Sequence, residues 1–150
     1  MKAVIDASVI VKWFLPDPKL EPHVDQALAL LEDLKAGQVI VEQPPHWLTE
    51  VAAVITRLRP EIAETAIDLL DAMELPVTDD AMSLKKASQL SRELNHHLFD
   101  TLYHALAFER GLTLITADDH YLRKASHLGQ MISLADWPGA EPTRGQGSGS

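Results

Sequence analysis

Cysteine is absent from the 150 residues of this chain, and its absence excludes several kinds of chemistry. Without cysteine there are no disulfide bonds, no thiolate nucleophile and no cysteine-bound zinc. No apolar run approaches the roughly 20 residues that a membrane-spanning helix needs. The apolar run before Asp6 is also too short for the core of a secretory signal. We therefore expect a cytoplasmic protein with no membrane partner.

The chain also lacks a net positive charge. It has 13 Lys and Arg residues against 22 Asp and Glu residues, which gives a formal net charge of -9. Proteins that hold nucleic acid by neutralising its phosphates are usually basic. A nucleic-acid partner would therefore have to be held by a local basic patch, by bound cations or by specific contacts.

The rest of the composition is that of an ordinary globular domain, with 46% hydrophobic and 23% charged residues. Short apolar segments alternate along the chain with segments of helical periodicity. Because parallel strands need crossover connections, this pattern predicts an α/β fold with a mostly parallel sheet and helices on both faces. We expect strands at 2–6, 39–41, 75–77, 112–116 and 131–134, and helices at 7–15, 21–36, 44–59, 61–73, 80–94, 99–110 and 119–126.

The length suits one domain, which we place at residues 1–137. Residues 138–150 are rich in Gly, Pro and Ser, and they end in Gly-Gln-Gly-Ser-Gly-Ser. This composition is typical of a flexible linker, so we exclude the segment from the fold.

Four carboxylates stand at positions that such a fold could bring together. Asp6 ends the first predicted strand, and Asp118 follows the fourth. Ligand sites in open parallel sheets form outside the carboxyl ends of the strands. Asp100 lies at the start of the sixth predicted helix, and Glu50 lies on the margin of the apolar stripe of the third. A carboxylate on such a margin is expected to be half-buried and to need a cation or a donor.

Each acid alone has a simpler explanation: the three aspartates as helix caps, and Glu50 in a surface salt bridge to Arg57 or to a neighbouring residue. If the four converge, however, they repel one another and raise each other's pKa unless a cation compensates. Oxygen ligands alone select a hard ion, so Mg²⁺ or Mn²⁺ is expected and zinc is not. Such an ion keeps positions for a phosphate oxygen and an attacking water, and the predicted chemistry is hydrolysis of a phosphodiester.

Basic and apolar side chains offer further candidates. Lys12, Arg57, Arg59 and Arg123 could contact nucleic-acid phosphates, although a solvated helix face is the alternative for each pair of basic residues. The apolar segment 13–15 and the leucine stripe of the second predicted helix either pack in the core or bind a partner helix.

The histidines do not indicate a metal site. His96 and His97 are adjacent and cannot easily share one ion, and no histidine pair has the spacing of zinc ligands. His104, four residues after Asp100, is expected on the surface or at the rim of the site.

Four short motifs, which follow one another in order within residues 1–137, resemble those of PIN-domain proteins. They are VIDASVIV at 4–11, LTEVA at 48–52, FDTLYHALA at 99–107 and LITAD at 114–118. Each motif is weak alone, whereas four in sequence with suitable gaps are specific. The nearest resemblance is to the VapC-type toxins of bacterial toxin–antitoxin pairs.

The resemblance implies a three-layer α/β/α sandwich and a Mg²⁺- or Mn²⁺-dependent endoribonuclease. The acidic site residues of the family map onto Asp6, Glu50, Asp100 and Asp118. Of these, Asp6, Asp100 and Asp118 would bind the metal. Toxins of this type are usually homodimers, act on RNA and are silenced by an antitoxin protein that covers the site.

The resemblance also assigns supporting residues and shows one departure. The hydroxyls of Ser8 and Thr116 match positions that support the acids or a metal-bound water. Asp118, rather than the adjacent Asp119, matches the metal-binding position. Ala53 stands where many relatives have Asn, which removes a local hydrogen bond but no metal ligand.

Other classes of protein also place acids at strand ends. A phospho-receiver domain has a pair of adjacent acids after its first strand, whereas Ala7 follows Asp6 here, and the last predicted strand is not followed by the expected Lys. A haloacid-dehalogenase-type phosphatase needs a second Asp at the position of Ser8. A non-catalytic PIN-like scaffold would have lost some of the acids. A PIN-type nuclease that acts in RNA processing or on DNA remains an alternative.

Overall fold

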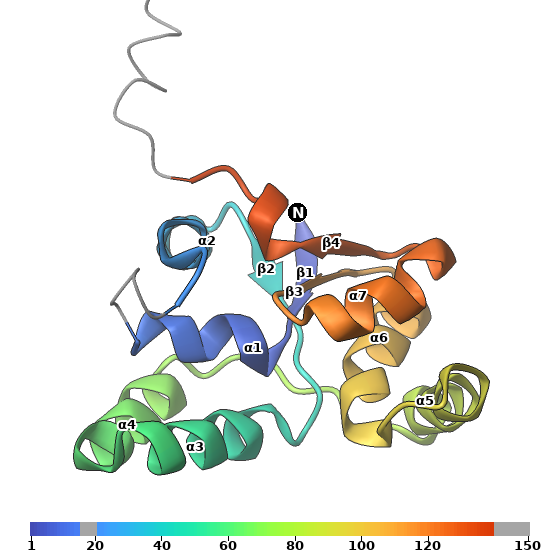
Figure 1. The fold of residues 1–150 in the computed structure, drawn as a ribbon, viewed down its shortest axis with the longest axis horizontal. Helices are drawn as coiled ribbons and strands as arrows, with labels where there is room; N and C mark the ends of the chain where they lie inside the picture. Colours follow the sequence, from blue (N-terminus) through green and yellow to red (C-terminus); the bar gives the residue numbers. More distant parts are fainter. Residues whose placement is uncertain (16–20, 140–150) are drawn as a thin grey trace, which may run out of the picture.

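The computed structural model describes residues 1–15 and 21–139, which form a parallel sheet with helices around it (Figure 1). The strands are β1 (Lys2–Ile5), β2 (Ile40–Val41), β3 (Thr113–Thr116) and β4 (Met131–Ser133). Their order in the sheet is β2-β1-β3-β4, and all three pairings are parallel. The predicted α/β class with a parallel sheet is confirmed.

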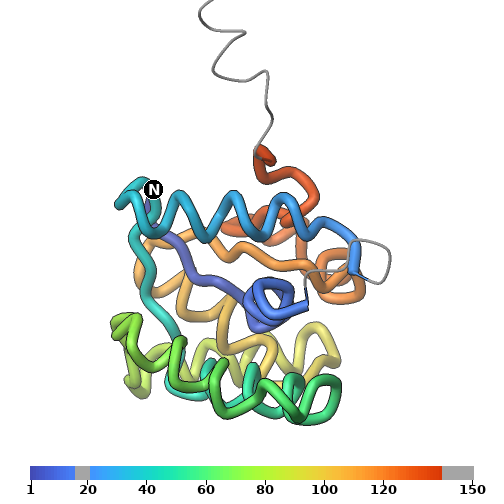
Figure 2. Tube along the Cα trace, turned by 90° about the vertical axis from the view of Figure 1, so that its left-hand side faces the viewer, coloured from blue at the N-terminus to red at the C-terminus, as the bar shows by residue number. Residues whose placement is uncertain are grey.

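The helices are α1 (Ala7–Ile10), α2 (Val24–Lys35), α3 (Trp47–Leu58), α4 (Ala63–Ala72), α5 (Ala81–Leu94), α6 (Leu98–Arg110) and α7 (Asp119–Ala125). Short 3₁₀ turns occupy Val11–Trp13, Pro60–Ile62, Ser126–Leu128 and Leu134–Asp136. Figure 2 shows α2 on one side of the sheet and α3 to α6 on the other. This arrangement is the expected three-layer sandwich.

The core lies on both sides of β1, whose Ala3, Val4 and Ile5 are fully buried. Its neighbours in the core include Tyr103 and Leu106 of α6, which are also fully buried, since α6 packs directly against β1 and β3. Burial on both faces explains why the central strands read as continuous apolar runs rather than as alternating ones.

The turn between α6 and β3 determines which end of α6 faces the site. The helix ends at Gly111, which adopts the left-handed conformation (φ 66°) that glycine tolerates without a steric penalty, and β3 begins two residues later. The carboxyl end of α6 therefore lies beside the start of β3. Its amino end, which carries Asp100, lies beside the carboxyl ends of the strands.

The predicted strand at 75–77 is reduced to one bridge between Gln43 and Val77. The backbone N–H of Gln43 donates to the Pro76 carbonyl at 2.8 Å, and the Thr78 N–H donates to the Gln43 carbonyl at 2.9 Å. Pro44 and Pro76 have no N–H to continue such a ladder, which is why the pairing stops.

Other boundaries differ by a few residues. The predicted first helix is regular only from Ala7 to Ile10 and continues as a 3₁₀ turn to Trp13. The second helix begins at Val24, because His23 before it adopts a left-handed conformation (φ 61°). Most of the predicted tail, residues 140–150, lies outside the described residues. Across the described ranges, no helix has both the length and the apolarity needed to span a bilayer.

Candidate functional site

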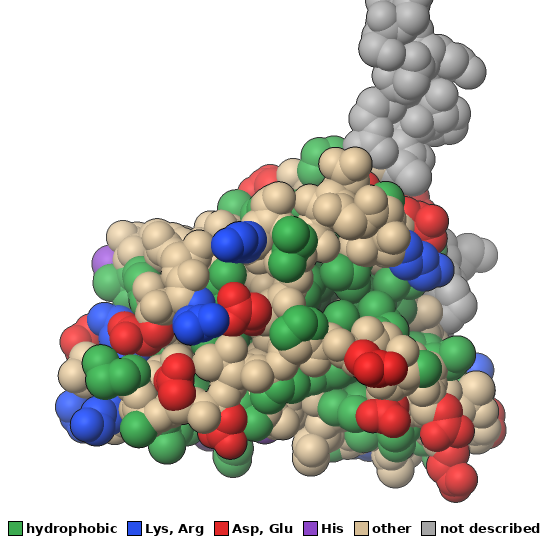
Figure 3. Space-filling view, turned by 180° about the vertical axis from the view of Figure 1, so that it is seen from behind, with side chains coloured by type: hydrophobic (Ala, Val, Ile, Leu, Met, Phe, Trp, Pro, Cys, Tyr) green, Lys and Arg blue, Asp and Glu red, His purple; other side chains and the backbone are tan. Residues whose placement is uncertain are grey.

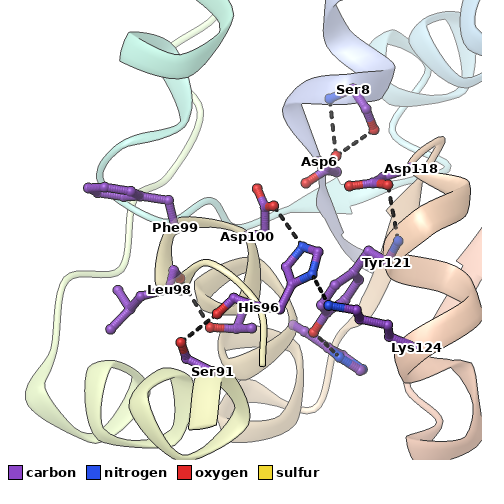
Figure 4. Close-up of polar contacts among 12 residues, drawn as sticks. Asp6, Ser8, Ser91, His96, Leu98, Phe99, Asp100, Asp118, Tyr121 and Lys124 are labelled. Carbon is purple, nitrogen blue, oxygen red and sulfur yellow. Dashed lines mark hydrogen bonds and ion pairs between the residues drawn. The ribbon is translucent and has the colours of Figure 1, made fainter. Parts of the chain in front are cut away.

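A pocket of about 490 Å³ opens where the carboxyl ends of β1 and β3 meet the amino ends of α3 and α6. All four predicted acids line this cavity, which we call the carboxylate pocket: Asp6, Glu50, Asp100 and Asp118. Figure 4 shows Asp6, Asp100 and Asp118 turned toward one another from three separate elements. Residues that are more than 110 positions apart in the chain thus share one cavity.

Asp6 is held in place by β1 and by the first turn of α1. Its backbone N–H continues the sheet by donating to the Ile115 carbonyl at 3.0 Å. Its Oδ2 atom accepts hydrogen bonds from the Ser8 N–H at 3.1 Å, from the Ser8 hydroxyl and from the Thr116 hydroxyl at 3.3 Å. Asp6 therefore caps α1, and the capping explanation is correct for this residue although it also lines the pocket.

The same two hydroxyls hold the chain that leads to Asp118. The Ala117 N–H donates to the Ser8 hydroxyl at 3.0 Å, and the Asp118 N–H donates to the Thr116 hydroxyl at 3.0 Å. Asp118 in turn caps α7 by accepting from the Tyr121 N–H on Oδ1 at 3.0 Å. The adjacent Asp119 is exposed at the start of α7, outside the residues that line the pocket.

Asp100 lies in the first turn of α6 without capping it, so the capping explanation is wrong for this residue. The helix begins at Leu98, and His97 occupies the cap position. The Oδ2 atom of Asp100 instead lies 2.9 Å from Nε2 of His96. A carboxylate in the first turn is favoured by the helix dipole, which is positive at this end.

Glu50 lies in the first turn of α3, and its side chain is 29% exposed, as its place on the margin of the apolar stripe predicts. Its Oε1 atom accepts a hydrogen bond from the Tyr103 hydroxyl at 2.7 Å and lies 3.3 Å from Nε2 of His46. These two side chains, rather than Arg57, are its partners. Burial raises the pKa of Tyr103 well above its usual value, so this hydroxyl remains a donor.

The electrostatics of the pocket oppose full ionisation. Burial raises the pKa of Asp6 to about 6; the Ser8 hydrogen bonds oppose this rise, and the charges of Asp100 and Glu50 add to it. Burial also raises the pKa of Asp100, against the hydrogen bond from His96, with Glu50 and Asp118 adding to the rise. A bound cation would remove this repulsion.

His96 is the residue that sequence reasoning missed. One ligand atom each from His96, Asp100 and Asp118 lies within 4.8 Å of the others. A second cavity of about 490 Å³, which we call the histidine pocket, shares Asp100 and Asp118 with the carboxylate pocket. Its other lining residues are Ser91, Asn95, His96, His97, His120 and Lys124. The spacing of four residues between His96 and Asp100 was the available signal.

His104 is not at the rim of the site, as was predicted, but fully buried. Its Nδ1 lies 2.8 Å from the Tyr121 hydroxyl, and its Nε2 lies 2.8 Å from the Gly129 carbonyl oxygen. Burial lowers its pKa. Four residues along α6 place it one turn deeper than Asp100, where Tyr121 and the Gly129 carbonyl meet its ring.

Of the predicted basic residues, only Lys12 lines the carboxylate pocket, and it forms an ion pair with Glu21 at 3.0 Å. Arg59 contacts Glu61 at 2.6 Å. Arg57 and Arg123 are exposed outside the lining of both pockets. On the face in Figure 3, the described Lys and Arg side chains are scattered among acidic and hydrophobic ones rather than gathered into one patch.

Comparison with known proteins gives a family match over most of the chain. A sequence model of the PIN domain matches residues 3–127. Comparison with curated protein sequences yields no match.

Several solved structures share the fold. VapBC2 of Rickettsia felis, crystallised with a DNA fragment from its promoter, has a TM-score of 0.60 at 18% identity, over 89% of this chain and 97% of that chain. A toxin–antitoxin complex from Klebsiella pneumoniae has a TM-score of 0.57 at 15% identity, over 88% and 97%. The protein PAE2754 of Pyrobaculum aerophilum has a TM-score of 0.59 at 17% identity, over 90% of each chain.

Proposed function

This chain belongs to the PIN-domain family, and from that premise we propose that it is a Mg²⁺- or Mn²⁺-dependent endoribonuclease. The observation that carries the proposal is the way the four acids use their oxygen atoms. Each makes its described hydrogen bonds through one oxygen: Oδ2 of Asp6, Oε1 of Glu50, Oδ2 of Asp100 and Oδ1 of Asp118. Among the described residues, the second oxygen of each has no such partner. Four carboxylates held in this way have an oxygen each to offer to a ligand.

The donor set fits a hard divalent cation, since the pocket offers carboxylate oxygens whose mutual repulsion a cation would relieve. Asp6, Asp100 and Asp118 would hold it. A bound ion of this kind lowers the pKa of a water and stabilises the charge that develops on a phosphodiester during hydrolysis.

The protein's own side chains would orient the reactants. Glu50, fixed through Oε1 by Tyr103 and His46, keeps Oε2 to hold the attacking water and to accept its proton. Ser8 and Thr116 restrain Asp6 and the chain before Asp118, so that both acids keep their geometry when charged. No protein nucleophile is required, because the water attacks the phosphorus directly.

The biological setting we propose is that of a VapC-type toxin in the cytoplasm, acting as a homodimer with an antitoxin partner. The fold shared with two proteins described as VapBC2 and a toxin–antitoxin complex supports this setting. An apolar groove between α2 and α4 suits a partner helix. It has a volume of about 380 Å³ and is lined by Trp13, Phe14, Leu31, Lys35, Leu69, Leu70 and Met73.

The test is cleavage of RNA by the purified protein with Mg²⁺ or Mn²⁺. We expect Asp6→Asn and Asp100→Asn to reduce the rate by roughly 100-fold or more, since outer partners of metal ligands alone cost 10- to 100-fold. Asp119→Asn is the matched control, because this aspartate is exposed beside Asp118, and it should cleave at the normal rate.

Three outcomes would contradict the proposal. Unchanged cleavage by Asp100→Asn would remove that acid from the site. Cleavage of DNA but not RNA would favour the alternative PIN-type nuclease. Stable phosphorylation of one aspartate by acetyl phosphate, without nuclease activity, would favour a receiver domain.

A further inference from the structure

A chain of contacts leads from Lys124 on α7 through His96 to Asp100 on α6 (Figure 4). The Lys124 ammonium lies 3.3 Å from Nδ1 of His96 and donates to the Asn95 carbonyl at 2.8 Å. On the other side of the ring, Nε2 of His96 lies 2.9 Å from Oδ2 of Asp100. The ring is therefore held at both nitrogens.

These contacts determine which nitrogen of His96 carries the proton. A lysine ammonium can only donate hydrogen bonds, so Nδ1 of His96 must accept and has no proton. The ring proton is then on Nε2, and this N–H donates a hydrogen bond to Asp100. The side chain of His96 is only 5% exposed and lies against Tyr121, with ring centroids 4.9 Å apart, so its orientation is restrained as well.

We infer that His96 is a positioning residue for Asp100 and that Lys124 keeps the ring proton of His96 off Nδ1. This inference rests on the function proposed above. The Nε2–H bond occupies Oδ2 of Asp100 and leaves Oδ1 as the oxygen that would hold the cation. Outer hydrogen bonds of this kind orient the ligands of a metal and tune its affinity. The Ser8 hydroxyl restrains Asp6 in the same way, by donating a hydrogen bond to Oδ2 of Asp6.

The alternative is that His96 is itself a ligand, since it clusters with Asp100 and Asp118 within 4.8 Å. Coordination through Nε2 would displace its proton, and the neutral ring would then carry a proton on Nδ1. That N–H would face the Lys124 ammonium, and two donors cannot form a hydrogen bond with each other. The contact with Lys124 therefore argues against direct coordination.

The first test determines which ring nitrogen of His96 carries a proton, and it needs no metal. In ¹⁵N-detected NMR of the full chain, we expect a proton on Nε2 of His96 and none on Nδ1, as the contacts with Asp100 and Lys124 require. In Lys124→Met, a signal from protonated Nδ1 should appear, because the ammonium that excluded this proton is gone while Asp100 still accepts from Nε2–H. A proton on Nδ1 of His96 in the unaltered protein would overturn the inference.

The second test reads metal binding, with Mn²⁺ alone as the probe. Titration followed by electron paramagnetic resonance should show binding weakened by about 10-fold or more in His96→Ala. In His96→Gln, whose amide N–H can replace Nε2–H, most of this loss should be recovered. His127→Ala is the matched control, since this histidine is exposed and lies outside the lining of both pockets, and it should bind Mn²⁺ normally.

Direct coordination has its own signature. If His96 were a ligand, pulsed electron paramagnetic resonance would detect the nitrogen of a coordinated imidazole, and His96→Gln would bind as weakly as His96→Ala. Either result would overturn the positioning role.

The two proposals fail in different ways. If Asp6→Asn and Asp100→Asn bind Mn²⁺ as the unaltered protein does, the proposed metal site fails. If these two variants lose binding while His96→Ala keeps it, only the role of His96 fails.

Discussion

Asp6 meets two opposing conditions in one side chain. Its carboxylate accepts hydrogen bonds from Ser8 and Thr116, which favour the charged form. It is also partly buried beside Glu50 and Asp100, and this burial and these charges disfavour the charged form. Burial prevails, so the pKa of Asp6 in the folded protein is about 6. A residue arranged in this way favours cation binding over the stability of the metal-free protein.

The first prediction concerns the metal-free stability of Asp6→Asn. A folded-state pKa raised above 3.8 contributes stability that is complete below pH 3.8 and is lost as pH rises through about 6. An asparagine side chain has no charge to keep out of water, and its Oδ1 can still accept a hydrogen bond from the Ser8 N–H. In EDTA at pH 7.5, the variant should therefore be more stable than the unaltered protein, by about 1 to 3 kcal/mol.

Urea unfolding at pH 4.5 and pH 7.5 checks this prediction. The stability gained by the substitution should be largest above pH 6 and should shrink at pH 4.5. A gain that is the same at both values would show that relief from charge burial is not its cause.

At the scale of elements, the carboxyl end of β1 depends on a side chain rather than on a strand. Gln43 is fully buried, its Oε1 accepts the Ile5 N–H at 2.8 Å, and its Nε2 donates to the Ile5 carbonyl at 2.9 Å. Beyond the pairing of Ala3 with Val41, this amide substitutes for backbone pairing with β2. It thereby supports the residue directly before Asp6.

The second prediction is that Gln43→Leu destabilises the protein by about 2 to 4 kcal/mol. The change leaves both backbone groups of Ile5 buried without partners, and each unsatisfied group costs about 1 to 3 kcal/mol. Urea unfolding measures the loss, and hydrogen exchange should show faster exchange of the Ile5 amide. Unchanged protection of this amide would mean that the Gln43 contact contributes little to the strand end.

At the scale of the whole molecule, the formal charge of -9 means that long-range attraction would not bring the proposed RNA substrate to the pocket. Individual cations near the rim must contribute instead. Arg57 lies one helical turn beyond Ala53, which lines the carboxylate pocket, so the two share a side of α3. Its side chain is exposed, so we expect it to contact a phosphate of the proposed RNA substrate.

The third prediction is that Arg57→Ala raises KM for RNA cleavage several-fold and leaves kcat nearly unchanged. Loss of one phosphate contact weakens substrate binding without touching the reacting atoms. Arg110→Ala is the matched control, because Arg110 lies at the carboxyl end of α6, away from the pocket, and pairs with Glu42. Equal effects in both variants would indicate a general influence of charge and no specific contact by Arg57.

Local patterns in the sequence were sufficient for most of the elements, although not for the strand predicted at 75–77, and they pointed to the acids at the strand ends. The apolar runs and helical periodicities predicted the alternation of strands and helices, because the buried face of each segment determines the spacing of its apolar residues. Asp6 and Asp118 were identifiable because each directly follows a strand, and parallel strands present their carboxyl ends at one edge of a sheet.

Only the tertiary structure decided which side chains meet across long separations. His96 meets Lys124, which is 28 residues away, and Gln43 meets Ile5, which is 38 residues away. His104 was predicted at the rim and is buried, because the Tyr121 side chain and the Gly129 carbonyl lie against its ring. Periodicity within one segment carries no information about which other segment will cover it, and that choice is made by the packing of layers.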